Sequence, residues 1–467
     1  MRRLVVIVLL VAAITCGVFA LASGDRVAAT RASGPGVATP VWSARRVPQP
    51  FVDAVGATRL QHDLDAAAGK DACFEVLTAA GPVASRAGNV PYMGASTQKL
   101  LTAAAAIAVL GPDTTFTTRA VAAGDPANGT VDRLFLVGGG DPLLTTAEFR
   151  AQLDADPEYQ GTPATSLESL ADGIVAKGVR RVNGLAVDDS RQDSVRYLPV
   201  WPPNYRSEGQ IGPLGALSVN RGLTTLKPPR VVDDGAVYAG NELARLLRAR
   251  GVVVNGSATH GKAPDNAVEL AKVDSAALRE IAAEVVRSSD NFGAEDLMRE
   301  IGVKAAHDGT TDGGIGAAMA KLAELGVPMT GVHLVDGSGL ARDNRVTCEA
   351  LAYVVDLGAR PEFDALWSGM SVAGQTGTLA DELRGTGLEG KLRGKTGFIN
   401  GVTGLAGLVD VGRPIRFAFV VNGNFGEDQA VKLRGQLAQI IARFPQAPSG
   451  DDLVPAPVPP APRPAGS

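Results

Sequence analysis

Aromatic side chains, cysteines and histidines are scarce in this chain of 467 residues, and charge of neither sign is in large excess. Aromatic residues make up 5% of the chain, and the formal net charge is −4. This balance offers no basic surface to a nucleic acid, so we expect no nucleic-acid partner. Hydrophobic residues make up 45% and charged residues 20%. Such a globular composition over this length predicts two or more packed units.

Histidine occurs four times, at positions 62, 260, 307 and 333. These residues form no HExxH pair and no Cys/His cluster, so we expect no metal site. No organic cofactor is implied either. A Ser-His-Asp triad also lacks any local signature. A catalytic serine in this chain would therefore need a base other than histidine.

Of the three cysteines, Cys73 and Cys348 lie beyond the N-terminal apolar segment. The sequence leaves two interpretations open for them. They form one disulfide in an oxidising compartment, or they are two buried thiols that pack as small hydrophobic groups. Cys16 lies within the apolar segment, and the Ile14-Thr15 pair before it fits a lipid-attachment site poorly.

The N-terminus has the pattern of an export segment. Arg2 and Arg3 precede an apolar run over residues 4–22, and Ala20-Leu21-Ala22 fits a small-residue cleavage site. Residues 1–23 are therefore expected to be either a cleaved signal peptide or an uncleaved membrane anchor. Both alternatives predict an extracytoplasmic protein, secreted, periplasmic or anchored, whose only membrane contact is this segment.

The rest of the chain divides by composition. Residues 24–50 are rich in Ala, Gly, Pro and Ser and are expected to be a disordered linker. Residues 445–467 are dominated by Pro and Ala and are expected to be a disordered tail. Between them, strand patterns near both ends of the globular part enclose a run of helical patterns. This arrangement predicts an α+β domain over 51–113 and 274–444, with one sheet uniting the two parts.

Residues 114–273 are expected to be a large inserted region. Short strand patterns and turns dominate it, so we expect it to be mainly β, with two helical patterns near 166–177 and 242–250. In the flanking parts the predicted strands are 73–79, 82–86, 391–397, 404–411 and 415–421. The predicted helices there are 58–69, 99–110, 275–288, 293–301, 313–325, 346–358 and 428–443.

The first motif with chemical meaning is Ser96-Thr97-Gln98-Lys99, at the start of the apolar helix 99–110. Residues three apart on a helix share a face, so the Lys99 amine can approach the Ser96 hydroxyl. Burial lowers a lysine pKa, which lets the amine act as a base toward the serine. Taken alone, the motif is equally well explained as a helix start followed by a solvated lysine.

Two further motifs follow in order. Ser289-Asp290-Asn291 lies between two helical patterns, where the serine could relay a proton and Asn291 could hold a peptide group; alone it is typical of a plain helix cap. Lys395-Thr396-Gly397 lies on a predicted strand, where it could bind a substrate carboxylate. A phosphate-loop interpretation of Lys395-Thr396 fails, because position 389 is Glu rather than Gly.

Together the three motifs form the known signature of class A β-lactamases and penicillin-binding proteins. The chain resembles the class C low-molecular-mass penicillin-binding proteins, which are D-alanyl-D-alanine carboxypeptidases/endopeptidases of the penicillin-binding protein 4 type. The distances of 193 residues from Ser96 to Ser289 and 106 from Ser289 to Lys395 suit that family's inserted domains better than a class A β-lactamase. The resemblance spans roughly 55–445 and includes GGGDP (138–142), VDDS (187–190), GPLGALSVN (212–220), DGSGLAR (336–342) and GTL (377–379).

The resemblance implies a serine β-lactamase/transpeptidase-like fold and a D-Ala-D-Ala carboxypeptidase of peptidoglycan stem peptides, with endopeptidase action open. Ser96 would be the nucleophile and Lys99 its base, and β-lactams would acylate Ser96. Ser289, Asn291 and Lys395 would complete the catalytic set. The substrate-binding set would consist of Thr396, Gly397, Phe398, Asp188, Leu340 and Arg342.

Two of these assignments carry a qualification. The family matches Asp188 to the acid that holds the amino group of a diaminopimelate-type side chain, but Asp189 is adjacent and is the alternative. The family usually has Thr or Ser where this chain has Phe398, so a hydroxyl contact to the substrate carboxylate is lost while the backbone N–H remains.

Two rival functions stay open from sequence. A serine β-lactamase would need a deacylating acid, for which Glu284 and Glu295 are the nearby candidates. A catalytically weak envelope scaffold would have no need of the six intact motif residues, and their presence favours an enzyme.

Overall fold

A computed structural model describes residues 49–445 of the chain. The predicted signal peptide or anchor, nearly all of the predicted linker and all but the first residue of the predicted tail lie outside the described residues. Among residues 49–445, no helix has both the length and the apolarity needed to cross a bilayer. Of the described residues, 49–62 and 443–445 belong to one unit, and residues 63–442 form the second.

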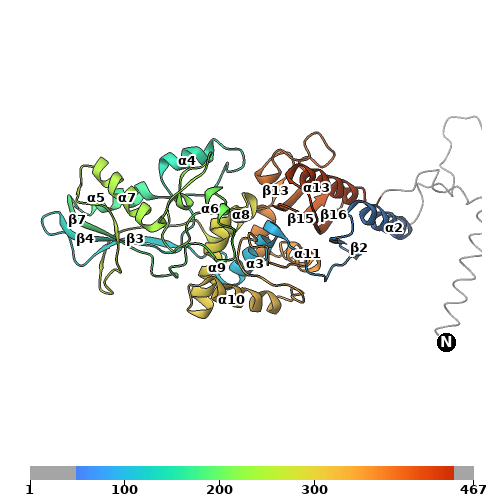
Figure 1. The fold of residues 1–467 in the computed structure, drawn as a ribbon, viewed down its shortest axis with the longest axis horizontal. Coiled ribbons are helices and arrows are strands. Elements are labelled where there is room, and N and C mark those ends of the chain that lie inside the picture. Colours follow the sequence, from blue (N-terminus) through green and yellow to red (C-terminus); the bar gives the residue numbers. More distant parts are fainter. Residues whose placement is uncertain (1–48, 446–467) are drawn as a thin grey trace, which may run out of the picture. The chain divides into compact units, whose positions relative to one another are not determined.

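The second unit contains a six-stranded antiparallel sheet that joins distant parts of the chain, as the sequence predicts. In Figure 1 its first strands are blue and its last strands are orange to red. In this sheet Phe74 pairs with Phe419, so a strand near the start of the unit lies beside one near its end. In spatial order the strands are β13 (Ser371–Val372), β14 (Leu392–Ile399), β15 (Val402–Asp410), β16 (Pro414–Asn422), β1 (Ala72–Thr78) and β2 (Gly81–Arg86).

A second sheet is built from the segment between 117 and 274. Its pairings are mixed, because β4 and β7 run parallel while β3 pairs antiparallel with β4 and β12. Its strands are β10 (Val253–Val254), β7 (Arg181–Asp188), β4 (Thr130–Val137), β3 (Thr117–Ala122) and β12 (Val268–Asp274), with β11 (Thr259–His260) also on β7. Two small pairs complete the strands: β5 (Leu144–Thr145) with β6 (Thr165–Ser166), and β8 (Leu223–Thr225) with β9 (Arg230–Val231).

This segment contains more helix than the mainly β structure that the sequence predicts. Parallel neighbours such as β4 and β7 need a crossover connection, and helices provide it here. The helices of the segment are α4 (Ala147–Asp154), α5 (Leu167–Ala176), α6 (Asn204–Ser207) and α7 (Gly235–Ala249), with the 3-10 turn η3 (Asn220–Gly222). Apolar side chains of α5 and α7 join those of the strands in one buried cluster. The segment is therefore mixed α and β.

The remaining helices largely follow the sequence prediction, including α3 and the helix from Cys348. They are α2 (Gln49–Ala67), α3 (Lys99–Leu110), α8 (Leu278–Arg287), α9 (Asn291–Ala306), α10 (Thr311–Glu324), α11 (Cys348–Leu357), α12 (Asp364–Ser368) and α13 (Glu427–Ala442). Three short 3-10 turns accompany them: η2 (Ala95–Gln98), η4 (Pro361–Phe363) and η5 (Gly377–Leu379).

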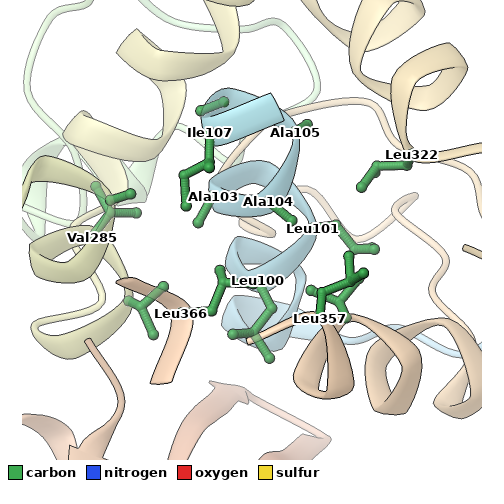
Figure 2. Packing of buried hydrophobic residues seen from close by; sticks show 14 of the residues in the cluster. Leu100, Leu101, Ala103, Ala104, Ala105, Ile107, Val285, Leu322, Leu357 and Leu366 are labelled. Carbon is green, nitrogen blue, oxygen red and sulfur yellow. The ribbon is translucent and has the colours of Figure 1, made fainter. Parts of the chain in front are cut away.

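Helix α3 is the centre of the largest buried cluster. Its residues from Lys99 to Ile107 are all buried, because apolar side chains cover its whole circumference. It packs against α8, α9, α10 and α11. Figure 2 shows Leu366 and Val285 on one side of the helix and Leu357 and Leu322 on the other. This packing fixes the helix that begins at Lys99, three residues after Ser96.

Cys73 and Cys348 form a disulfide, which decides between the two interpretations that the sequence left open. Cys73 lies on β1 and Cys348 begins α11, and both side chains are buried. The residues just before Cys348 run beside the segment leading to Ser96, since Val346 pairs with Tyr92 through two backbone hydrogen bonds. The disulfide therefore joins the sheet to the start of α11, close to the segment that leads to Ser96.

Candidate active site

Ser96 lies in the 3-10 turn η2, directly before α3, rather than in the α-helix itself. The residue before it, Ala95, has a φ of 46°, a left-handed conformation that costs free energy for any residue but glycine. Gly339 lies against this turn, because a β-carbon at position 339 would be 2.1 Å from the Ala95 carbonyl oxygen. The nucleophile candidate thus sits on a strained turn held by close backbone packing.

The Lys99 amine points at Ser96, as the three-residue spacing predicts. Its Nζ donates to Ser96 Oγ at 2.9 Å, to Asn291 Oδ1 at 2.6 Å and to the Ser338 carbonyl oxygen at 2.7 Å. These three acceptors match the three donors of an ammonium group. The structure therefore brings residues of the first two motifs into one hydrogen-bonded group.

The environment of Lys99 changes its acid–base chemistry. Its side chain is completely buried. Burial lowers the pKa of Lys99 from 10.5 to about 8, although the carboxylates of Asp336, Glu295 and Asp290 act to raise it. A pKa near 8 leaves a substantial neutral fraction at neutral pH, and only the neutral amine can accept the Ser96 proton.

The second motif lies at the junction of α8 and α9. Ser289 occupies the break between the helices with a φ of 59°, and Asn291 is the first residue of α9. Besides accepting from Lys99, Asn291 donates through Nδ2 to the Gln210 carbonyl oxygen at 2.8 Å. Asp290 forms an ion pair with the buried Arg221 at 3.1 Å. Gln210 and Arg221 come from the segment between β7 and α7, and the sequence did not single them out.

The third motif lies on β14, the strand that faces η2. A β-carbon at position 397 would lie 2.6 Å from the Gly94 carbonyl oxygen and 2.9 Å from Thr97 Cγ2. Gly397 therefore lets the strand approach the turn that carries Ser96. Thr396 Oγ1 shares a hydrogen bond of 2.7 Å with Thr378 Oγ1, within η5. The next residue, Phe398, is partly buried.

Lys395 is the second buried lysine of this group. Its Nζ donates to the Thr396 carbonyl oxygen at 2.9 Å. Burial lowers the pKa of Lys395 well below its ordinary value, and the positive charges of Lys99 and Arg434 lower it further. The positive charge of Lys99 lowers the Lys395 pKa because the two amines lie close to each other. Two buried lysines with lowered pKa values close to each other are suited to proton transfer.

Glu284 and Glu295, the two acids considered for a β-lactamase, have structural partners. Glu284 Oε1 accepts from Thr162 Oγ1 at 2.8 Å, and its carboxylate also pairs with Arg287. Glu295 accepts from the backbone N–H groups of Gly337 and Ser338 at distances of 2.7–3.0 Å. Both carboxylates are therefore engaged within the protein.

Leu340 and Arg342 follow the turn that binds Lys99. Leu340 is buried in a cluster with Trp201, Ile211, Leu214 and Phe292. Arg342 is exposed, and its Nη1 donates to the Asn400 carbonyl oxygen at 3.1 Å, just beyond the end of β14. The structure thus places both residues close to the elements that carry the motifs.

Asp188 lies elsewhere. It accepts from the backbone N–H groups of Ser190 and Ala263 at 3.0 and 2.8 Å. It lines a cavity of about 820 Å³ that also includes Leu110, at the far end of α3 from Ser96, and none of the motif residues. Asp189 differs: it pairs with Arg196, which donates to the carbonyl oxygen of Leu214 at 2.9 Å. Contacts therefore connect Asp189, and not Asp188, to the cluster around Leu340.

Between residues 49 and 445, no group of three or more His, Cys, Asp or Glu side chains has an arrangement suited to a metal ion. The site as described is built from serine, lysine, asparagine and threonine side chains together with backbone carbonyl oxygens.

Comparison with known proteins gives a family match over most of the described residues. The model of the D-Ala-D-Ala carboxypeptidase 3 (S13) family matches residues 60–229 and 223–444. The chain is 30% identical over 502 residues to a D-alanyl-D-alanine carboxypeptidase of Actinomadura sp. (strain R39), covering 87% of this chain and 90% of the relative. It is 33% identical over 347 residues to carboxypeptidase DacB of Mycolicibacterium smegmatis, covering 72% of each.

A solved structure is similar in fold. The crystal structure of penicillin binding protein 4 (dacB) from Haemophilus influenzae matches with a TM-score of 0.67 and 22% sequence identity. The match covers 83% of this chain and 97% of that chain. The α+β architecture with its antiparallel sheet is therefore the penicillin-binding fold that the sequence predicted.

Proposed function

The chain belongs to the D-Ala-D-Ala carboxypeptidase 3 (S13) family, and from this premise we propose how its own residues carry out the reaction. It is a serine-type D-Ala-D-Ala carboxypeptidase, a hydrolase of the penicillin-binding kind. The observation that carries the residue assignment is the hydrogen bond of 2.9 Å between Lys99 Nζ and Ser96 Oγ, inside a buried group that lowers the lysine pKa.

Acylation begins with proton transfer from Ser96 to neutral Lys99. The serine oxygen attacks the carbonyl carbon of the penultimate D-Ala, and the carbonyl oxygen becomes an oxyanion. We assign the backbone N–H groups of Ser96 and Phe398 as the donors to that oxyanion. The close approach of β14 to η2 at Gly397 supports this assignment, because it brings the two backbones together.

Collapse of the tetrahedral intermediate breaks the bond to the terminal D-Ala. Its amine nitrogen needs a proton, which Ser289 relays with the help of the Lys395 and Lys99 amines. Thr396 binds the departing carboxylate, while Asn291 orients both Lys99 and the substrate peptide group. Water then hydrolyses the ester on Ser96 and restores the free enzyme. β-Lactams acylate the same oxygen as substrate mimics.

We assign recognition of the substrate side chain to Leu340 and Arg342, beside the turn at 336–339. For the amino group of a diaminopimelate-type side chain we propose Asp189 rather than Asp188. The chain of contacts from Asp189 through Arg196 to Leu214 supports this choice, since Leu214 and Leu340 belong to one cluster.

The partner in the cell is then a peptidoglycan stem peptide that ends in D-Ala-D-Ala, outside the cytoplasm. The export pattern of residues 1–23 supports this location, and so does the Cys73–Cys348 disulfide, because disulfides persist in oxidising compartments. Membrane contact, if the N-terminal segment is retained, involves that segment alone.

The proposal is tested with purified enzyme and a synthetic stem pentapeptide that ends in D-Ala-D-Ala. We expect stoichiometric release of D-Ala by the wild type and none above background by Ser96→Ala at an unchanged melting temperature. A cross-linked muropeptide dimer, followed in parallel, measures endopeptidase action. Release of D-Ala by Ser96→Ala at the wild-type rate would refute the nucleophile assignment.

A further inference from the structure

The turn at 336–339 is connected to the nucleophile segment through three consecutive backbone carbonyls. Each carbonyl oxygen accepts one hydrogen bond from a side chain between positions 98 and 102. The pairs are Gln98 Nε2 with the Asp336 oxygen at 2.6 Å, Thr102 Oγ1 with the Gly337 oxygen at 2.6 Å, and Lys99 Nζ with the Ser338 oxygen at 2.7 Å. The position of this turn therefore determines where the Lys99 amine is held.

The backbone N–H groups of the same turn are held by two buried carboxylates. Glu295, on α9, accepts from the N–H groups of Gly337 and Ser338. The Asp336 side chain accepts from the N–H groups of Gly339 at 2.8 Å and Ala341 at 2.6 Å. Both carboxylates are fully buried. With its carbonyls and its N–H groups both engaged, the turn has little freedom to shift.

Three side chains also donate to the Asp336 carboxylate: Asn344 Nδ2 at 2.8 Å and Gln98 Nε2 at 3.3 Å reach Oδ1, and Trp201 reaches Oδ2. Trp201, in the segment between β7 and α7, donates through its indole Nε1 to Asp336 Oδ2 at 2.9 Å. Its ring is buried beside Leu340 and Phe292. None of the three motifs includes Trp201, and it touches neither Ser96 nor Lys99 through any hydrogen bond described for residues 49–445.

We propose that Trp201 is a positioning residue that acts on Lys99 through Asp336: the indole fixes the carboxylate, the carboxylate fixes the turn, and the Ser338 carbonyl of that turn directs the Lys99 amine at Ser96. The inference rests on the proposed role of Lys99 as the base toward Ser96. It adds to that role a connection from the segment between β7 and α7 to the reacting amine.

Asp336 has a second, electrostatic effect on the same amine. The groups that act on Lys99 are the carboxylates of Asp336, Glu295 and Asp290, which raise its pKa, and the Lys395 amine, which lies near it. Burial and the charge of Asp336 in turn raise the pKa of Glu295. Removal of the negative charge at position 336 lowers the Lys99 pKa. The pH at which acylation becomes fast then moves downward, which loss of structure alone would not produce.

The test compares two tryptophan variants of the full chain. Trp201→Phe keeps an aromatic ring and removes the donor to Asp336. Trp367→Phe is the matched control, since Trp367 Nε1 donates at 2.6 Å to the Val355 carbonyl oxygen, in α11. The measurement is the second-order rate constant for acylation by a fluorescent penicillin between pH 6 and 10, with the melting temperature of each variant.

We expect Trp201→Phe to acylate about tenfold more slowly at every pH, because a misplaced base loses reactive geometry. Trp367→Phe is expected to stay within about twofold of the wild type. Asp336→Asn is expected to move the rise of the pH profile downward by about one pH unit. Equal rates in the two tryptophan variants would overturn the proposal, and so would an unmoved profile in folded Asp336→Asn. If Asp336→Asn fails to fold, the tryptophan pair decides.

Different results would contradict the role of Lys99 as the base and the role of Trp201 as a positioning residue. If Lys99 is not the base, Lys99→Ala retains acylation, whatever position 201 contains. If Lys99 is the base but Trp201 does not position it, Lys99→Ala is inactive and Trp201→Phe acylates like the wild type.

Discussion

Gly397 on β14 and Gly94 before η2 approach so closely that a β-carbon at position 397 would lie 2.6 Å from the Gly94 carbonyl oxygen. The same β-carbon would lie 3.1 Å from the backbone nitrogen of Thr97. No side chain fits between the strand and the turn. The last residue of the Lys-Thr-Gly motif is thus a packing requirement for placing the strand beside Ser96.

Gly397→Ala is therefore expected to push β14 away from η2 and to slow acylation by at least about tenfold, since small displacements of reacting groups are costly. Gly387→Ala is the matched control, because a β-carbon there meets no atom within 4 Å. Acylation rates and melting temperatures of both variants check the prediction. A Gly397→Ala enzyme with wild-type acylation would contradict the packing argument.

Acylation should depend on pH through Lys99. The reactive form is the neutral amine, and burial lowers the pKa of Lys99 to about 8. Below that pH the neutral fraction falls about tenfold per pH unit, so the acylation rate should fall with it and level off above the pKa. Stopped-flow or quench measurements with a β-lactam over pH 6–10 provide the profile. A rate independent of pH across that range is the contrary result.

The Cys73–Cys348 disulfide should contribute strongly to stability. It joins residues 275 positions apart, so it restricts a long loop in the unfolded chain. Replacing both cysteines by alanine is expected to lower the free energy of unfolding by about 3–5 kcal/mol. Denaturant titration of wild type and double variant measures the difference. A change below about 1 kcal/mol would mean that packing around β1 and α11 compensates for the lost cross-link.

Phe398 should influence the choice of substrate. Its backbone N–H is retained, but its side chain offers no hydroxyl to a substrate carboxylate. Phe398→Thr is expected to raise the release of D-Ala from a free pentapeptide severalfold, with a smaller change on a pentapeptide analogue whose terminal carboxylate is amidated. Parallel assays on the two substrates give the ratio. An equal change on both would show that position 398 does not recognise the carboxylate.

The parts of the site that sequence predicts are those formed by neighbours in the chain. Ser96 and Lys99 are three residues apart, and their approach follows from helical geometry. The strand of Lys395 and the helix after Ser96 follow from local patterns, and so do most of the predicted helices. Within the segment 117–274 the same local signals indicated helices near 166 and 242, yet the crossovers between parallel strands add more helix than the turn-rich sequence suggested.

Contacts between residues far apart in the chain could not be predicted from the sequence. Trp201 and Asp336 are separated by 135 positions, and Asn291 and Gln210 by 81, and no periodicity connects such pairs. The disulfide could not be decided either, because it depends on how β1 packs near α11. The acid proposed for the substrate side chain remained a choice between two adjacent residues. Their different hydrogen-bond and ion-pair partners separate them.

The most direct test of the account is the mass of the intact protein after incubation with penicillin, followed by mapping of the acylated peptide. The account predicts a stable adduct of one penicillin per chain on Ser96, absent from Ser96→Ala. Penicillin hydrolysed without an adduct would indicate a β-lactamase instead. Unchanged penicillin without an adduct would contradict the assignment of Ser96 and Lys99 as a working nucleophile and base.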